Sequence, residues 1–300
     1  MHPNLIPFTE IPLLPPRAND ANKGDCGRVV VIGGSRGMAG APCLSARAAC
    51  RAGAGLVLVG VPKSIWDIVA AKLDEAQTRG VGSSADDEIT EQATPELLEI
   101  CAWSDVVVMG PGLSHRAETS KTVHDIVAQC ERPMVLDADA LNAFSGGRAE
   151  LIFASQKKHT PREIVLTPHP GEMARLLNTS IEVVQSDRAQ AVRACADLTG
   201  AVAVLKGAET LVCDGRRLYV NNTGNPGMAT GGTGDVLAGI VGALIGQDMP
   251  AFEAACLSVY LHGLAGDIAA EKRGMWSLVA GDLIEELPAA FLKHAKGESE

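Results

Sequence analysis

From Arg28 onward the chain alternates between short runs of β-branched and aliphatic residues and longer amphipathic segments. Runs this short and this apolar are typical of strands buried on both faces, and strands separated by helices pair in parallel. The alternation therefore predicts an α/β protein, a three-layer sandwich with a central, mostly parallel sheet flanked by helices. The predicted strands are Val29–Ile32, Leu56–Val61, Val106–Met109, Met134–Leu136, Ile164–Leu166 and Ala201–Leu205, and the helices between them are Ala39–Gly53, Pro95–Ala102, Glu118–Cys130, Gly171–Leu177 and Ile181–Leu198.

The pattern changes late in the chain. Two short apolar runs, Thr210–Cys213 and Leu218–Val220, flank the turn that begins at Asp214, which predicts a hairpin at a sheet edge near residues 210–220. Beyond Asp235 the chain is predicted to be mostly helical, over Val236–Ile245, Ala251–Glu271 and Gly281–His294. No internal repeat is visible, so we expect an N-terminal lead-in over residues 1–27 and a single catalytic domain over residues 28–300.

The richest motif is the run from Asn225 to Asp235 (NPGMATGGTGD), which precedes an apolar helical segment. Its glycines let successive backbone N–H groups converge, and the start of the next helix adds unpaired N–H groups and positive dipole. Gly231, Gly232 and Gly234 are therefore predicted to let these N–H groups form a phosphate-binding anion hole, with Asp235 taking a proton from a hydroxyl aimed at the phosphate. On spacing alone, a glycine-rich turn with Asp235 as a helix cap remains the alternative.

Two common nucleotide loops are excluded. No lysine follows the glycines of the run ending at Asp235, as a Walker A loop requires. A second glycine-rich turn, from Gly33 to Ala41, opens a helix where a dinucleotide-binding loop would lie, but Ser35 stands where that motif needs its second glycine. We interpret this turn as a place where a substrate approaches the backbone near Gly40 and Ala41.

Four shorter motifs follow predicted strands, where open α/β sheets bind ligands. Gly112, in MGPGL, offers a backbone amide, although a plain glycine-proline turn fits the pattern equally well. Asp137 and Asp139 offer carboxylates for Mg²⁺ or hydroxyl contacts, or cap the next helix. His169, held between two prolines, favours ligand contact, and Lys206, in KGAET, meets a phosphate or is a solvated turn residue.

Composition limits the kinds of molecule that the protein is expected to bind and the compartment in which it is expected to act. The net charge of −10 argues against binding to nucleic acid or to anionic membrane, because both depend on cationic patches. No apolar run is long enough to span a membrane, and the first 20 residues lack the pattern of a signal peptide. The eight cysteines are dispersed, as expected of reduced, buried thiols in a soluble cytoplasmic protein.

Taken in order, these motifs resemble the ADP-dependent NAD(P)H-hydrate dehydratase family of the ribokinase-like superfamily. The likeness runs from about Lys23 to about Leu292, and its most specific part is the run from Asn225 to Asp235. It implies a repair enzyme that removes water from the 6-hydroxy adducts of NADH and NADPH (NADHX and NADPHX), with ADP as phosphoryl donor together with Mg²⁺, releasing AMP and phosphate.

The resemblance also implies roles for individual residues, and it places the anion hole at Gly232, Thr233 and Gly234. Ala41, Gly112, His169 and Asp235 would contact the hydrate, whereas Lys206, Gly207, Ala208, Glu209, Thr210 and Gly234 would contact the adenine nucleotide. It further implies a homo-oligomer, a tetramer. Many relatives carry a fused epimerase domain, for which we expect no room in the residues before Arg28.

Several alternatives stay open. Met38 stands where the family often has an aromatic residue, and Asn22 where a histidine often precedes Lys-Gly-Asp. A small-molecule kinase of the same fold, using ATP on a vitamin precursor or sugar, is the first alternative, and a non-catalytic nucleotide-binding protein is the second. The residues themselves decide neither ADP against ATP nor NADHX against NADPHX.

Overall fold

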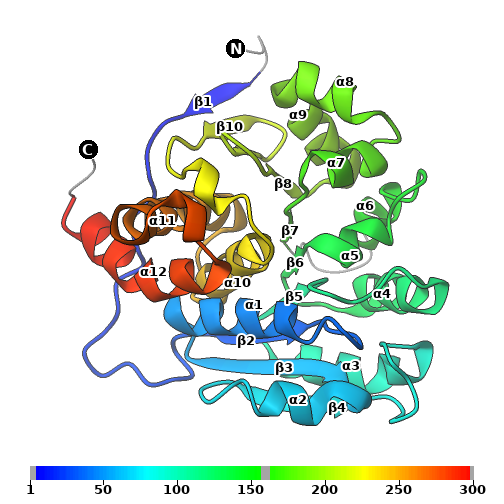
Figure 1. Cartoon of the computed structure of the whole chain (residues 1–300). Helices are drawn as coiled ribbons and strands as arrows, with labels where there is room; N and C mark the ends of the chain where they lie inside the picture. The colour runs from blue at the N-terminus through cyan, green and yellow to red at the C-terminus, as the bar shows by residue number, and fades with distance from the viewer. Residues whose placement is uncertain (1–4, 157–162, 298–300) are drawn as a thin grey trace.

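The computed structural model describes residues 5–156 and 163–297, and within them one ten-stranded sheet runs through the molecule (Figure 1). Its strands lie in the order β1-β10-β9-β8-β7-β6-β5-β2-β3-β4, and only the pairs of β9 with β8 and β10 are antiparallel. The strands are β1 (Ile6–Phe8), β2 (Arg28–Ile32), β3 (Leu56–Pro62), β4 (Gln77–Val81), β5 (Val106–Met109), β6 (Met134–Leu136), β7 (Ile164–Leu166), β8 (Val202–Leu205), β9 (Leu211–Cys213) and β10 (Arg217–Val220).

Helices cover both faces of the sheet, which confirms the predicted three-layer fold (Figure 1). Alternate residues of β2 show the division, because Val29 and Val31 pack into one core cluster and Val30 and Ile32 into the other. One face carries α1 (Gly40–Arg51), α2 (Trp66–Ala70), α10 (Thr233–Gly246), α11 (Ala251–Arg273) and α12 (Ala280–Ala295). The other carries α3 (Thr94–Trp103), α4 (Ala117–Gln129), α5 (Ala138–Asn142), α6 (Glu150–Gln156), α7 (Pro170–Leu176), α8 (Ile181–Ser186) and α9 (Arg188–Thr199).

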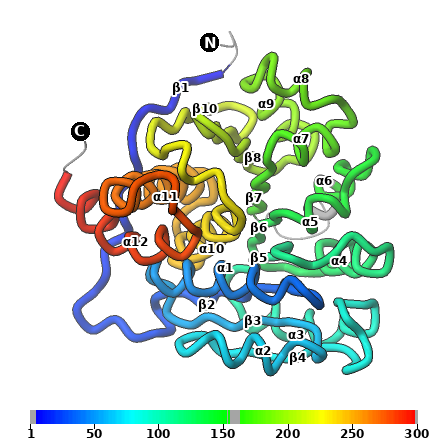
Figure 2. The backbone as a smooth tube through the Cα atoms, viewed as in Figure 1, coloured from blue at the N-terminus to red at the C-terminus, as the bar shows by residue number. Residues whose placement is uncertain are grey.

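The sheet edge near the predicted hairpin has one more strand than expected. The hairpin of β9 and β10 is present, and β1, from the lead-in, pairs in parallel with β10 outside it. Figure 2 shows the backbone passing from β1 around the side of α11 and α12 before it enters β2. Residues 5–27 of the predicted lead-in thus supply the last strand of the sheet on this side.

Strand order reverses between β2 and β5. From β2 the chain builds outward to β3 and β4, then returns to β5 on the other side of β2 and continues to β8. Such a switch point leaves a crevice at the carboxyl ends of the two strands, where open α/β sheets bind ligands. The loops that follow β2 and β5 carry the predicted substrate contacts Ala41 and Gly112, so the topology places both beside this crevice.

Close packing of α1 on α10 positions the functional loops. Gly239 of α10 lies against the backbone of α1 so tightly that an added Cβ would overlap the carbonyl oxygen of Ser45.

Within the described residues no helix is apolar and long enough to cross a membrane, although α11 has 23 residues.

We predict that Gly239→Ala destabilises the protein by about 1–3 kcal/mol, because the methyl group forces α1 and α10 apart. The matched control is Gly281→Ala in the first turn of α12, where an added Cβ meets nothing within 4 Å. This control should be neutral or stabilising, since alanine favours a helix over glycine. Urea unfolding of both variants checks the pair, and equal effects would contradict the packing argument.

Candidate active site

The predicted anion hole is the start of α10. Gly232 is its N-cap and adopts the left-handed conformation, with φ of 94° and ψ of −14°, which favours glycine. An added Cβ there would collide with Leu44 of α1 and lie 3.1 Å from Ala280 of α12. No side chain among the described residues caps this helix, so the first N–H groups of a 14-residue helix stay available for an anion.

Asp235 lies in the first turn of α10, and its carboxylate forms no hydrogen bond with the described residues. Its Oδ2 lies 3.9 Å from the point that a Gly232 Cβ would occupy, so it faces the helix start. Burial, reinforced by the negative charge of Asp137 and only partly opposed by Lys206, raises the pKa of Asp235 to about 7. A carboxylate with this pKa is suited to accept a proton at neutral pH.

Asp282 of α12 shows what a capping aspartate looks like in this protein. It occupies the same position in its helix as Asp235, third after a residue and a glycine, but accepts a 2.9 Å hydrogen bond from the Val279 N–H. The Asp235 side chain makes no such bond with any described residue. The capping alternative for Asp235 therefore has no support in the geometry.

Lys206 links the start of α10 to a buried acidic cluster. Its Nζ donates to Asp137 Oδ1 at 2.7 Å, lies 3.8 Å from Glu172 Oε2 and borders Gly234, whose Cβ would be 3.2 Å away. Asp137 and Glu172 are 1% and 5% exposed. Although burial opposes it, the negative charges of Asp137 and Glu172 hold the pKa of Lys206 above its ordinary value, so it is a permanent cation beside the anion hole.

Asp137 does not cap α5, the helix that it precedes. Its Oδ1 accepts from Lys206 and from the Thr167 hydroxyl at 2.7 Å, and its Oδ2 lies 4.0 Å from the position of a Gly234 Cβ. Asp139 is engaged elsewhere, accepting from the Ser114 N–H at 2.9 Å and pairing with His115 at 3.2 Å. No cluster of three or more His, Cys, Asp or Glu in the described part of the chain is arranged as a metal cage.

His169 caps α7. Its Nδ1 accepts hydrogen bonds from the N–H groups of Gly171 and Glu172, at 3.0 and 3.3 Å, and Glu172 in turn accepts from the His169 N–H at 2.8 Å. Burial and the charge of Lys206 lower the pKa of the imidazole, consistent with a neutral ring. Half of the His169 side chain is exposed, and its Nε2 lies 3.4 Å from Glu172 Oε1.

The predicted substrate contacts at the switch point lie together. Gly112 has φ of 68°, and an added Cβ would lie 2.9 Å from the Met38 carbonyl oxygen and 3.3 Å from Ala41 Cβ. Ala41 is one helical turn before Ser45, whose hydroxyl donates to the Asp235 carbonyl oxygen at 2.6 Å. The crevice at β2 and β5 is therefore joined to Asp235 through one turn of α1.

The loop from Gly207 to Thr210 leaves β8 directly after Lys206. Gly207 and Glu209 have positive φ, of 137° and 51°, and the Thr210 hydroxyl closes the loop on the Gly207 carbonyl at 2.9 Å. Arg188 of α9 braces it by donating to the Leu205 and Glu209 carbonyls, at 3.2 and 3.4 Å. Of the predicted nucleotide contacts, Lys206 and Gly234 are brought into contact, whereas Ala208 and Glu209 lie exposed on the loop.

Comparison with known protein families matches residues 29–289 to the NAD(P)H-hydrate dehydratase family. The chain belongs to this family. A bifunctional NAD(P)H-hydrate repair enzyme of Moorella thermoacetica is 45% identical over 277 residues, 92% of this chain and 51% of the relative. The chain thus spans about half the length of such bifunctional relatives.

Two further relatives are similar over most of their own length. An ADP-dependent (S)-NAD(P)H-hydrate dehydratase of Neisseria meningitidis is 41% identical, covering 89% of this chain and 86% of that protein. The crystal structure of an ADP/ATP-dependent NAD(P)H-hydrate dehydratase of Bacillus subtilis, co-crystallised with ATP and Mg²⁺, superposes with a TM-score of 0.77 at 25% identity, covering 93% and 94% of the two chains.

Several residues around this dehydratase-family site had no sequence signal. Ser45 and Arg188 hold backbone carbonyls from distant helices, and His262 of α11 bonds the Thr233 carbonyl at 2.9 Å through its Nε2. Burial lowers the pKa of His262 to about 4, so the ring is neutral and its Nε2–H is the donor. No local pattern marks such residues, because their partners lie at least 17 positions away in the chain.

Proposed function

We propose that this protein catalyses the ADP-dependent dehydration of NADHX and NADPHX to NADH and NADPH, releasing AMP and phosphate. The observation that carries the proposal is Asp235, a partly buried carboxylate without a hydrogen bond to the described residues and with a pKa near 7, directed at the uncapped start of α10. Membership of the NAD(P)H-hydrate dehydratase family supports this chemistry over that of a vitamin or sugar kinase.

In this mechanism Asp235 takes the proton of the substrate's 6-hydroxyl as that oxygen attacks a phosphoryl group. ADP, when bound, supplies its β-phosphoryl group, and AMP leaves as the bond to that phosphorus breaks. The N–H groups of Gly232, Thr233 and Gly234 hold the developing negative charge of the phosphoryl group, and the Lys206 ammonium adds a positive charge at the same helix start. The 6-oxygen then leaves as phosphate while C5 loses a proton, which restores the double bond of the dihydronicotinamide ring.

The remaining predicted residues take supporting roles. Ala41, Gly112 and the Nε2 edge of His169 contact the hydrate, and the loop Gly207–Thr210 contacts the adenine nucleotide. Mg²⁺ would be held mainly by phosphate oxygens and water, as is usual for this ion, with Asp137 Oδ2 as the nearby carboxylate oxygen that carries no bond to a described residue. There Mg²⁺ would neutralise phosphate charge.

We also propose that the protein acts in the cytoplasm as a homo-oligomer, a tetramer. Buried free thiols such as Cys43, Cys195 and Cys256 suit a reducing compartment. The Ala-rich composition of α1 would permit close subunit packing, although α1 also packs closely on α10 of its own chain.

The proposal is tested by incubating the protein with NADHX, ADP and Mg²⁺ and following the absorbance of the restored dihydronicotinamide. Recovery that requires ADP, with AMP and phosphate released in equal amounts, is the expected result. Replacing ADP by ATP determines which nucleotide is the donor. No recovery, together with turnover of a vitamin precursor or sugar alcohol by ATP, would overturn the assignment in favour of the kinase.

The rate should rise with pH through about 7. Below that pH Asp235 is protonated and cannot accept the hydroxyl proton, whereas above it the carboxylate is available, so kcat/KM should follow a single ionisation near pH 7. Initial rates between pH 5.5 and 9, with ADP saturating, measure this. A profile that is flat down to pH 5 would exclude Asp235 as the base.

A further inference from the structure

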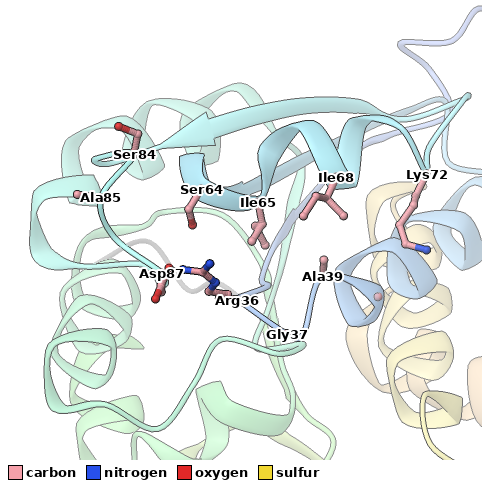
Figure 3. Close-up of a pocket in the computed structure, with 11 residues that line it drawn as sticks. Arg36, Gly37, Ala39, Ser64, Ile65, Ile68, Lys72, Ser84, Ala85 and Asp87 are labelled. Atoms are coloured by element: carbon pink, nitrogen blue, oxygen red, sulfur yellow. Dashed lines mark hydrogen bonds and ion pairs between the residues drawn. The ribbon is translucent and has the colours of Figure 1, made fainter.

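A cavity of about 700 Å³ lies outside the residues assigned above. It is enclosed by three segments: the loop after β2, the region around α2, and the loop after β4. Figure 3 shows residues of all three segments arranged around one space, with Arg36 and Asp87 on one side and Lys72 on the other. Its size is within the range of small-molecule sites.

The wall of this cavity suits a ligand that is both anionic and apolar. Arg36 is paired with Asp87 at 3.1 Å, whereas Lys72 forms no ion pair or side-chain hydrogen bond with the rest of the described chain. The three charges leave a net positive cavity in a protein of net charge −10. Ile65 and Ile68 add apolar surface, and Ser64 and Ser84 add hydroxyl groups.

This cavity is adjacent to the substrate end of the active site. Ala39 and Gly40 are part of its wall, and the next residue is Ala41, which lies against Gly112. One turn further along α1, Leu44 contacts Gly232 at the anion hole. A ligand with one end at Asp235 that follows the start of α1 therefore enters the cavity with its other end.

We propose that this cavity binds the adenosine-phosphate half of the hydrated dinucleotide, with Lys72 contacting a phosphate oxygen and Ile68 packing on the base. The inference rests on the proposed function, which fixes the hydrated nicotinamide at Asp235 and requires a second site for the other nucleotide half. The cavity has a positive charge for the phosphate and an apolar wall for the base, and it lies next to the place of the nicotinamide half.

Lys72→Ala and Lys72→Glu test this assignment in the full chain. We expect KM for NADHX to rise about tenfold in Lys72→Ala, the usual effect of losing a charge-assisted hydrogen bond, and further in Lys72→Glu, with kcat unchanged. The hydrate of reduced nicotinamide mononucleotide lacks the adenosine half, so its KM should not change. The control is Lys121→Ala, an exposed lysine on α4 paired with Glu91 and Asp125, which should alter neither KM.

Binding of ADP-ribose, measured by calorimetry with ADP saturating the donor site, separates this inference from the proposed function. Binding that weakens about tenfold in Lys72→Ala supports the cavity even if no hydrate is dehydrated, which would overturn the function alone. Dehydration with KM and ADP-ribose binding both insensitive to Lys72 would overturn the cavity assignment and leave the function intact.

Discussion

Asp235→Asn should lower kcat by about 10²–10⁴-fold while leaving the affinity for ADP within a factor of two or so. The amide has nearly the shape of the carboxylate but cannot take a proton, so only the chemical step is lost. Because the raised pKa of Asp235 means that the folded protein disfavours its ionised form, the variant should also be more stable than the wild type above pH 7. Steady-state rates, ADP calorimetry and thermal unfolding at pH 8 measure the three effects.

The effect of Asp235→Asn on stability depends on pH, and its direction follows from the raised pKa of Asp235. Between the ordinary pKa of an aspartate, 3.8, and about 7, the folded state binds a proton that the unfolded state has lost, so the wild type becomes less stable as pH rises through this window. Asparagine removes this dependence. The stability advantage of Asp235→Asn should therefore be absent near pH 4 and complete above pH 7.

Asp282→Asn is the matched control for this variant. Both aspartates are the third residue of a helix, but Asp282 caps its helix and contacts Arg273 at 3.1 Å. Its replacement should cost up to about 1 kcal/mol of stability, because the amide oxygen can still accept from the Val279 N–H but the charge that pairs with Arg273 is lost, and it should leave kcat unchanged. If Asp235→Asn also lost stability and kept its rate, Asp235 would be a structural cap and not the catalytic base.

The fold was predictable wherever local pattern and tertiary environment agree. The six apolar runs became β2, β3, β5, β6, β7 and β8 because strands buried on both faces need apolar side chains at every position. The edge strands were not predicted. β4 contains Gln77, Thr78 and Arg79, and β1 has an exposed Ile6, since an edge strand packs fewer side chains and its sequence resembles a loop.

The predicted helix Ile181–Leu198 is two helices, α8 and α9, separated at Asp187. Asp187 has a non-helical backbone, with φ of −146° and ψ of 83°, and its side chain accepts from the Gln190 N–H at 2.9 Å, which starts the second helix. The hydrophobic period runs through the break, so periodicity alone gave one helix. The polar segment 81–90 contains the end of β4 and then the loop that lines the cavity.

The motifs of the site could be predicted from the sequence, but the contacts between their side chains could not. Each strand-end motif was recognisable because parallel strands present their carboxyl ends at one edge of the sheet. The pairing of Lys206 with Asp137, 69 positions apart, depends on the order of β6, β7 and β8, which no local pattern reveals. Lys206 appeared as a phosphate ligand or a solvated turn residue, whereas the structure makes it the cation of a buried acidic cluster.

Lys206→Met is expected to destabilise the protein by about 3 kcal/mol at pH 8, because it leaves Asp137, Glu172 and Asp235 without their shared cation. The loss should shrink toward pH 5. There Glu172, whose pKa burial already raises, and Asp235 take up protons and no longer repel one another. Thermal or urea unfolding at the two pH values measures the difference.

The same substitution should change the chemistry in a way that a purely structural lysine would not. Without the ammonium that partly opposes burial, the pKa of Asp235 rises above 7, so the pH–rate profile of any remaining activity should move to higher pH. Lys63→Met is the matched control, because Lys63 lies 4.0 Å from Glu96 on the surface and its loss should cost under about 0.5 kcal/mol with no change in the profile. A Lys206→Met enzyme whose profile keeps its midpoint near 7 would mean that the lysine holds the fold but does not tune the base. In that case the proton affinity of Asp235 is set by burial and the neighbouring carboxylates alone.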